Sequence, residues 1–311
     1  MAHVFKGMGE SFVLDQKAEI HNELPSGIYT ITAQPQIGIV FTPLKITKDH
    51  LIRVKDSVTD EVLKFITNFT SEESKARYKK TKVIHKCGIL LEGPAGSGKS
   101  ASVNLILDAI IAQGAIVFFD ASPELVSAVL PAVREQNPDK LICVVYEEFD
   151  EWLSSDHATI NSFLDGQLSV DNMIVLATTN YIEKIPSRIK NRPSRFQMVK
   201  HVGLPNEELR KAWFEQKLID IGHEDKIASF VASSEGMSMD QMKDLIVSHI
   251  ALDIPLHEVV DKLQKMSEGA AGIDDYVSSE HNELISSSAL RKLFALPKGL
   301  QIKKDDPWGR K

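Results

Sequence analysis

Hydrophobic positions near the start of the chain are spaced as in β-strands. Apolar residues gather over residues 27–33 and 37–42, and the Gln34-Pro35-Gln36 segment between them is typical of a turn. This pattern predicts a hairpin within a small β-rich element that covers residues 1–55. The spacing then changes, because the apolar positions over residues 59–70 follow the period of a helix.

From residue 88 to residue 178, short apolar runs alternate with segments of helical period. Strands are expected at residues 88–92, 115–119, 141–146 and 172–178. Helices are expected at residues 99–113 and 123–135, and again from about residue 157. Strands that are apolar on both faces and alternate with helices are typical of a parallel sheet covered on both sides. The pattern predicts an α/β core over residues 56–204.

Beyond Pro205 the pattern is helical only. Helices are expected at residues 206–221, 225–233, 238–252 and 255–266. The third begins with Ser238 and Gln241 in the spacing of a capping box. We therefore expect a small helical domain over residues 205–267. The tail, residues 268–311, is rich in Gly, Ser, Asp and Glu and is expected to be partly mobile, apart from a short helix near residues 287–295.

Composition narrows the functional classes. The chain has 311 residues, of which 43% are hydrophobic and 25% charged, and its mean hydropathy is −0.12. The formal charge of −7 argues against a protein whose main role is to coat nucleic acid. A local basic channel stays compatible with that charge.

One basic segment leaves two interpretations open. It surrounds Tyr78 and consists of Lys75, Arg77, Lys79, Lys80, Lys82 and Lys86. It is either a solvated face or a contact for an anionic partner or a neighbouring subunit.

The two cysteines and the absence of long apolar runs indicate the compartment. Cys87 and Cys143 both lie in apolar, strand-like runs, which favours buried thiols over a disulfide or a metal site. No apolar stretch reaches the length of a membrane span, and the first residues lack the layout of a signal peptide. We expect a cytoplasmic protein.

Residues 93–100 carry the strongest chemical signal. They fit the pattern GxxxxGK[ST] and follow the apolar run at residues 88–92, so a strand leads into a glycine-rich loop and then a helix. Such a loop surrounds a phosphate with backbone N–H groups at a helix N-terminus. Lys99 is expected to reach the β- and γ-phosphates of ATP, and the Ser100 hydroxyl to hold Mg²⁺. The expected ATP-binding residues of this segment are Gly93, Pro94, Ala95, Gly96, Ser97, Gly98, Lys99, Ser100 and Ala101.

Acidic and amide side chains follow the next core strands. Glu147 and Glu148 come directly after the strand that ends at Tyr146, and Asn180 follows the strand at residues 172–178. Phosphoryl transfer asks a protein mainly to position groups and neutralise charge, so these side chains suit the carboxyl edge of the sheet. We expect Glu147 to act on Mg²⁺ through water, Glu148 to polarise the attacking water, and Asn180 to hold that water or sense the γ-phosphate.

Two arginines follow Asn180. Arg192 and Arg195 lie in the segment Arg-Pro-Ser-Arg-Phe, after the phosphate loop and the acid pair in chain order. An arginine supplied by a neighbouring subunit stabilises charge on the transferring phosphoryl group. The alternative for either arginine is a surface salt bridge; the order of the motifs favours the role in catalysis.

Together these motifs resemble the AAA branch of the AAA+ P-loop ATPases over residues 56–266. The resemblance rests on GPAGSGKS at 93–100, VVYEEFDE at 144–151, FLDG at 163–166, ATTN at 177–180, RPSRF at 192–196 and EGMS at 235–238. It implies a P-loop NTPase domain followed by a four-helix lid, ATP and Mg²⁺ as cofactors, and an adenine contact near Gly236. It also implies a homo-oligomeric ring, usually hexameric, in which Arg192 and Arg195 complete the neighbour's site. Within the branch, the chain looks most like the subgroup of the mitochondrial translocator of the Rieske protein and its bacterial and phage relatives.

The chain departs from the family pattern at three places that bear on function. In the expected lid, residues 238–241 replace the small-residue run that usually follows the Gly and Ser, next to the adenine contact near Gly236. Glu147 stands where the family usually has Asp, which lengthens the carboxylate by one methylene. The loop at residues 122–131 lacks the aromatic with which threading members grip a peptide. Its apolar residues either present an apolar pore surface or belong to a helix packed on the sheet; they are Leu125, Val126, Val129 and Leu130.

The leading interpretation is an ATPase ring that remodels or translocates a protein substrate, in the manner of a chaperone. The alternative is a nucleotide-dependent ATPase that acts on DNA as a loader or packaging accessory, which the basic segment at residues 75–86 favours. A third reading is a virion or scaffold protein that keeps a nucleotide site for assembly.

Overall fold

The computed structural model describes residues 3–8, 11–16, 23–34, 38–46, 57–155, 157–165 and 170–266. The chain divides into two units, residues 1–244 and residues 245–311. The predicted tail, residues 268–311, and its short helix lie outside the described residues, and Gly166 of the FLDG segment does too.

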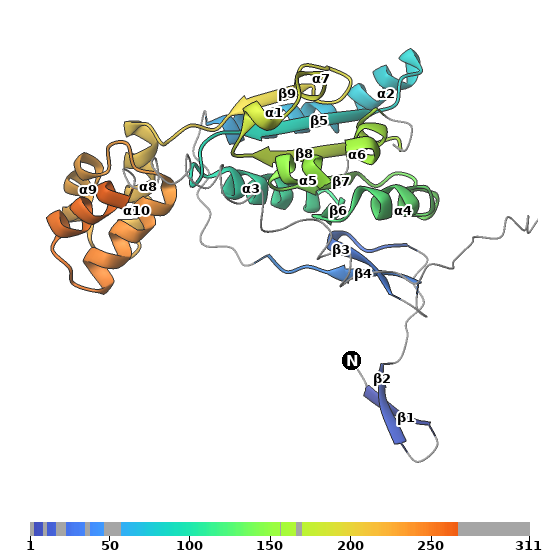
Figure 1. The fold of residues 1–311 in the computed structure, drawn as a ribbon, viewed down its shortest axis with the longest axis horizontal. Coiled ribbons are helices and arrows are strands. Elements are labelled where there is room, and N and C mark those ends of the chain that lie inside the picture. Colours follow the sequence, from blue (N-terminus) through green and yellow to red (C-terminus); the bar gives the residue numbers. More distant parts are fainter. Residues whose placement is uncertain are drawn as a thin grey trace, which may run out of the picture. The chain divides into compact units, whose positions relative to one another are not determined.

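A seven-stranded sheet with the order β4-β3-β6-β7-β8-β5-β9 forms the centre of the first unit (Figure 1). Its parallel strands are β3 (Gly27–Gln34), β6 (Ile116–Phe119), β7 (Ile142–Tyr146), β8 (Met173–Thr179), β5 (Lys86–Glu92) and β9 (Met198–His201). β4 (Gly38–Pro43) is antiparallel to β3. The mostly parallel sheet, with helices on both faces, has the P-loop NTPase α/β fold that the sequence predicts.

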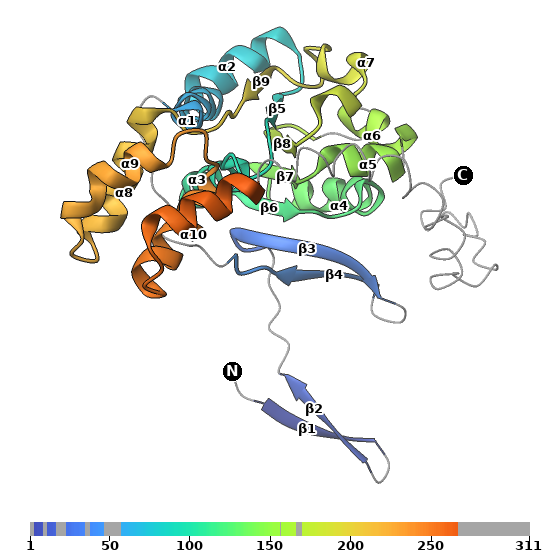
Figure 2. The same ribbon diagram turned by 60° about the vertical axis from the view of Figure 1, so that its left-hand side comes forward.

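Helices cover the two faces separately, as Figure 2 shows. One face packs against α1 (Val58–Phe69) and α3 (Lys99–Ile111). The other packs against α4 (Pro123–Gln136), α5 (Phe149–Ser155) and α6 (His157–Leu164). Strands β5, β7 and β8 are buried along almost their whole length, which explains their continuous apolar runs.

The hairpin predicted at residues 27–42 is present as β3 and β4. It does not form a separate sheet, because it is part of the central one. β3 pairs in parallel with β6, with Gly27 opposite Ile116. Tyr29 and Ile31 of β3 are buried in the same core as α4. The central sheet therefore crosses the boundary expected at residue 55. A separate antiparallel pair joins β1 (His3–Met8) to β2 (Ser11–Gln16).

The helical region after the sheet begins within the first unit. It contains α8 (Glu207–Ile219), α9 (Ile227–Ser233) and α10 (Met239–Ile246). The predicted capping box is confirmed, because the Gln241 backbone N–H donates to Ser238 Oγ (3.2 Å) and the Ser238 N–H donates to Gln241 Oε1 (2.9 Å). The end of α10, residues 245–246, already belongs to the second unit, whose described part also includes a π-helical turn, Val247–Ala251, and helical residues 256–266.

Four short elements of the core were not expected from the sequence: α2 (Glu72–Thr81), α5, α7 (Ser187–Lys190) and β9. The 3₁₀ turns Ile182–Lys184 and Glu224–Lys226 were not expected either. The segment at residues 122–131 forms part of α4, and Val126, Val129 and Leu130 are buried against the sheet. The packed helix is thus the correct alternative there, and those three side chains are not available as a pore surface. Cys87 and Cys143 are buried free thiols, as predicted. None of the described helices is long and apolar enough to cross a membrane.

Candidate functional site

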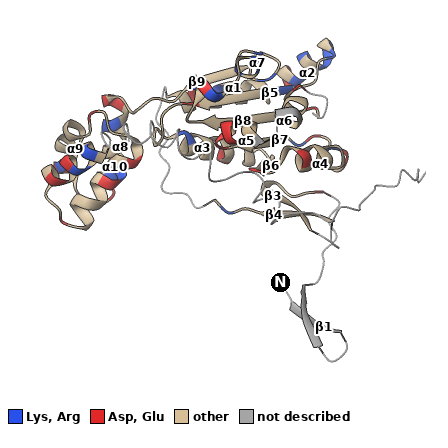
Figure 3. Cartoon of the chain, in the orientation of Figure 1, with Lys and Arg blue, Asp and Glu red and all other residues tan. Residues whose placement is uncertain are grey.

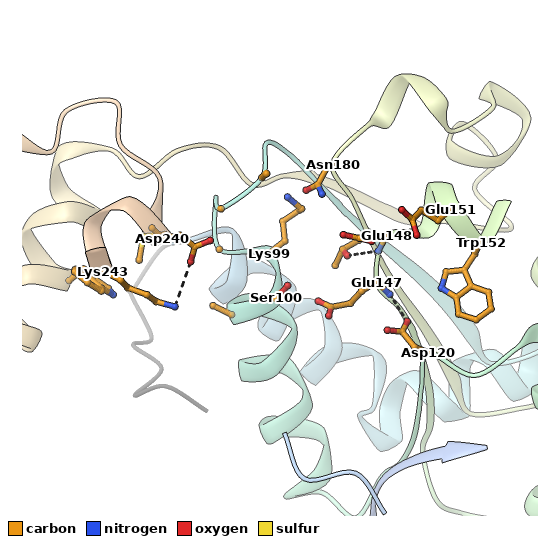
Figure 4. Close-up of a pocket in the computed structure, with 17 residues that line it drawn as sticks. Lys99, Ser100, Asp120, Glu147, Glu148, Glu151, Trp152, Asn180, Asp240 and Lys243 are labelled. Carbon is orange, nitrogen blue, oxygen red and sulfur yellow. Dashed lines mark hydrogen bonds and ion pairs between the residues drawn. The ribbon is translucent and has the colours of Figure 1, made fainter. Parts of the chain in front are cut away.

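A cavity of about 720 Å³ lies within the first unit where the strands β5 to β8 end at their carboxyl edge (Figure 4). Most of its walls come from the phosphate-loop segment, the residues that follow β6, β7 and β8, and helices α8 and α10. The lining residues are Ala95, Gly96, Gly98, Lys99, Ser100, Ala101, Asp120, Glu147, Glu148, Glu151, Trp152, Thr178, Asn180, Trp213, Met239, Asp240 and Lys243.

The loop between β5 and α3 takes a shape that only glycine allows. Gly93 has φ +152°, and a Cβ there would lie 2.1 Å from the Val202 carbonyl oxygen. Gly96 has φ +70°, and a Cβ there would meet Ser238 Oγ at 2.9 Å. The absence of side chains leaves backbone N–H groups free to surround a phosphate at the N-terminus of α3.

Lys99 lies at the first position of α3 and points back over the loop. Its ammonium donates to the carbonyl oxygens of Gly93 and Pro94, both at 2.8 Å. An ammonium has three protons, so one remains for a phosphate oxygen. Burial lowers the pKa of Lys99, while the nearby carboxylates of Glu92, Glu147 and Glu148 oppose that shift.

The acid pair occupies the turn between β7 and α5. Glu147 Oε1 is buried and has no hydrogen-bond partner among the described residues. Ser97 Oγ, in the phosphate loop, is likewise buried without a partner there. Buried polar atoms without a partner are costly in a native structure unless a ligand, ion or water meets them. Together with the glycine loop, they show that these residues fit a phosphate and a metal-bound water.

Asn180 lies at the end of β8 and lines the same cavity as Lys99 and Glu148 (Figure 4). The residue before it in the strand is fixed, since Thr179 Oγ1 donates to Asp150 Oδ1 at 2.6 Å. The structure thus brings together the loop, Ser100, both acids and Asn180, in the order that the sequence predicted.

Two indoles lining the cavity were missed in the sequence. Trp213 comes from α8 and Trp152 from α5. A flat aromatic face in a nucleotide cavity suits an adenine base. Trp213 gave no signal in the sequence, because it follows the apolar period of its helix like an ordinary core residue.

The helical region meets the loop through α10 rather than through Gly236. The Met239 N–H donates to the Gly96 carbonyl oxygen at 2.9 Å. Asp240 and Lys243 also line the cavity, and Lys243 Nζ lies 3.7 Å from Asp240 Oδ1. Gly236 does not line the cavity.

Arg192 and Arg195 lie outside the cavity, and both form ion pairs with the carboxylate of Asp165. Arg195 donates to both oxygens of Asp165, from Nε and Nη2 at 2.7 Å, and its side chain is 5% exposed. Arg192 Nη1 meets Asp165 Oδ1 at 3.2 Å, and its side chain is 55% exposed. The hydrogen bond and charge of Arg195 lower the pKa of Asp165. Neither arginine lines the cavity of its own chain.

No curated protein matches the chain. Residues 89–204, which include the phosphate loop, the acid pair, Asn180 and both arginines, match the family model described as the ATPase family associated with various cellular activities (AAA). This segment of the chain is therefore similar to the AAA ATPases. A domain of this family implies ATP-hydrolysing activity in general.

Proposed function

We propose that the chain binds ATP with Mg²⁺ in the cavity at the carboxyl edge of the sheet and hydrolyses it in a homo-oligomeric ring. The observation that carries this proposal is the convergence of the phosphate loop, Glu147, Glu148 and Asn180 on one cavity. These groups come from β5, β7 and β8, so the fold is what assembles them. Each offers a part of what phosphoryl transfer requires.

Each residue of the site has a separate role in this proposal. Lys99 and the loop N–H groups bind the phosphates, and Ser100 and Glu147 hold Mg²⁺, with Glu147 acting through water. Magnesium, when bound, neutralises charge on the phosphates. Glu148 takes the proton of the attacking water, Asn180 orients that water, and Trp213 lies against the base.

A shared site explains the position of the arginines. Among the described residues that line the cavity, the cations are Lys99 and Lys243, and none is an arginine. Arg192 is the more exposed of the two arginines on Asp165, so it is the one free to reach a neighbouring subunit. We therefore assign the catalytic contact to Arg192 and the support of its segment to Arg195.

The wider role follows from the same proposal. Cycles of ATP hydrolysis in a ring, hexameric as the resemblance implies, would remodel or translocate a protein substrate in the cytoplasm. The narrower likeness to the Rieske-protein translocator and its relatives belongs to this proposal as well.

Two variants test the ATPase activity. We expect Lys99→Ala to abolish ATP binding and turnover. We expect Glu148→Gln to slow turnover by about 10²–10⁴-fold while ATP still binds, because the amide cannot take a proton. Lys211→Ala and Glu208→Gln are matched controls on the exposed side of α8, outside the cavity. Turnover that survives in both site variants would refute the assignment.

A second candidate function rests on α2. Lys75 and Arg77 are paired with Glu72 and Glu73 within the helix. The lysines at its end, Lys79, Lys80 and Lys82, are exposed and have no ion pair among the described residues. Figure 3 shows basic positions, in blue, on α2.

Such a patch suits a DNA backbone, and an ATPase that acts on DNA would use it. We expect salt-dependent DNA binding that weakens when the three lysines are changed to Gln. No DNA binding at low salt would remove this candidate and leave the protein-remodelling role.

A further inference from the structure

Asp120 lies directly after β6, beside the acid pair. Its backbone N–H donates to the Val145 carbonyl oxygen of β7 at 3.0 Å. Its side chain reaches the next turn, where Oδ1 accepts the backbone N–H of Glu147 at 2.9 Å (Figure 4). Asp120 therefore fixes the backbone of a proposed metal-site residue from the neighbouring strand.

The turn that carries the two acids is held from both sides of β7. Asp120, after β6, holds the Glu147 N–H, and Thr178 Oγ1 of β8 accepts a longer bond from the Glu148 N–H at 3.4 Å. Glu148 has φ +48°, in the left-handed region that residues other than Gly, Asn and Asp rarely adopt, whereas Asp120, with φ +45°, is of a type that tolerates it. A backbone of this kind persists only where its surroundings hold it.

Asp120 is itself held in place. The Trp152 side chain, from the helix that starts at the acid turn, hydrogen bonds to the Asp120 carboxylate. The carboxylate thus has two hydrogen-bond donors, the Glu147 N–H and the Trp152 side chain. The resulting network joins β6, the acid turn and α5.

We propose that Asp120 is a positioning residue for hydrolysis, which holds Glu147 and Glu148 where the metal and the attacking water need them. This inference rests on the proposed ATPase function. The phosphate loop lies between β5 and α3, and Lys99 is the first residue of α3, so neither depends on the contact between Asp120 and Glu147. Loss of that contact should therefore slow turnover and leave ATP binding intact. Misplacement of catalytic groups by about 1 Å is enough for a large loss of rate.

The test compares two substitutions. Asp120→Ala removes the acceptor, and we expect kcat to fall by about 10–100-fold with KM for ATP within about twofold of its original value. Asp120→Asn keeps an oxygen at Oδ1, and we expect it to recover most of kcat. Asp220→Ala, at the exposed end of α8, is the matched control.

Three outcomes overturn the proposal. The first is an unchanged kcat in Asp120→Ala. The second is a raised KM with kcat unchanged, which would make the residue part of ATP binding. The third is an Asp120→Asn variant as slow as Asp120→Ala that recovers only at high Mg²⁺, which would make Asp120 a metal ligand. If Asp120→Ala does not fold, Trp152→Phe removes the second contact and should lower kcat alone, by a smaller factor.

Hydrogen exchange separates this proposal from the ATPase function. In the full chain without nucleotide, the Glu147 amide should exchange at least about tenfold faster in Asp120→Ala than in the unaltered protein or in Asp120→Asn. If the unaltered protein shows no turnover, the ATPase function fails, and the exchange rates still decide whether Asp120 holds the acid turn. Equal exchange in all three proteins would refute the positioning role.

Discussion

Arg192 and Arg195 share one carboxylate but differ in burial, so their substitutions should have different effects. Arg195→Ala leaves Asp165 and Asn161 without a buried partner. We expect it to lower the free energy of unfolding by about 2 kcal/mol, less than for a fully buried pair because Asp165 is partly exposed. Arg192→Ala, at an exposed pair, should cost less than about 1 kcal/mol. Urea denaturation measures the unfolding free energy of both variants. Equal losses would contradict a structural role for Arg195 that Arg192 does not share.

Lys86 should make stability depend on pH. It is 8% exposed, donates to the Leu164 carbonyl oxygen at 2.5 Å, and burial lowers its pKa to about 8, with Arg195 adding to that shift and Asp165 opposing it. Above pH 8 the folded protein releases this proton while the unfolded chain still binds it, so stability rises with pH toward the ordinary pKa of lysine.

The matched variant for this prediction is Lys86→Met. From about pH 7.5 to about pH 9.5 the unaltered protein should gain about 2 kcal/mol of unfolding free energy relative to Lys86→Met. Denaturant midpoints at several pH values give the comparison. A difference that stays constant over this interval would show that Lys86 does not titrate there.

At the scale of single residues, the sequence predicted the parts of the site that have local spacing. The phosphate loop, the acid pair and Asn180 follow strands directly, so their neighbours in the chain indicate their place. Asp120 follows the strand expected at residues 115–119 in the same way, so its place in the chain could have indicated it, whereas Trp213 reaches the cavity only through the packing of α8. The burial of Arg195 depends on Asp165, a contact between residues far apart in the chain.

At the scale of elements, burial decided which strands could be predicted. β5, β7 and β8 are almost wholly buried and give continuous apolar runs. β9 has only four residues and alternates between half-buried and exposed positions, so it gave no signal. The attachment of β3 to β6 joins residue 27 to residue 116, and no local pattern reports such a pairing.

The attachment of the β3–β4 hairpin to the core can be tested through two isoleucines. Ile31 on β3 is 5% exposed within the main core, whereas Ile39 on β4 is 43% exposed. We expect Ile31→Ala to lower the free energy of global unfolding by about 3 kcal/mol, and Ile39→Ala by less than about 1 kcal/mol. A separate early transition in Ile31→Ala, with the main transition unchanged, would instead indicate an independent hairpin.

At the scale of the whole molecule, the proposed ring makes each ATP site the product of two chains. In such a ring, the cavity of one chain would supply the loop and Glu148, and the neighbour would supply Arg192, whose exposed side chain lies outside its own cavity. Such head-to-tail contacts close into rings when the rotation between subunits allows it. Two inactive variants should therefore complement one another.

Arg192→Ala retains the acid, and Glu148→Gln retains the arginine. In rings formed by co-expressing the two variants in equal amounts, about a quarter of the interfaces should pair an intact Glu148 with an intact Arg192, if assembly is random. We expect each variant alone to show little turnover and the mixture to recover up to about a quarter of the original rate. The control mixture combines Glu148→Gln with a double variant that carries both Lys99→Ala and Arg192→Ala. It should stay inactive, because every chain with an intact Glu148 then lacks Lys99. If Arg192 acts within its own chain, both mixtures remain inactive, because no chain in either carries both groups.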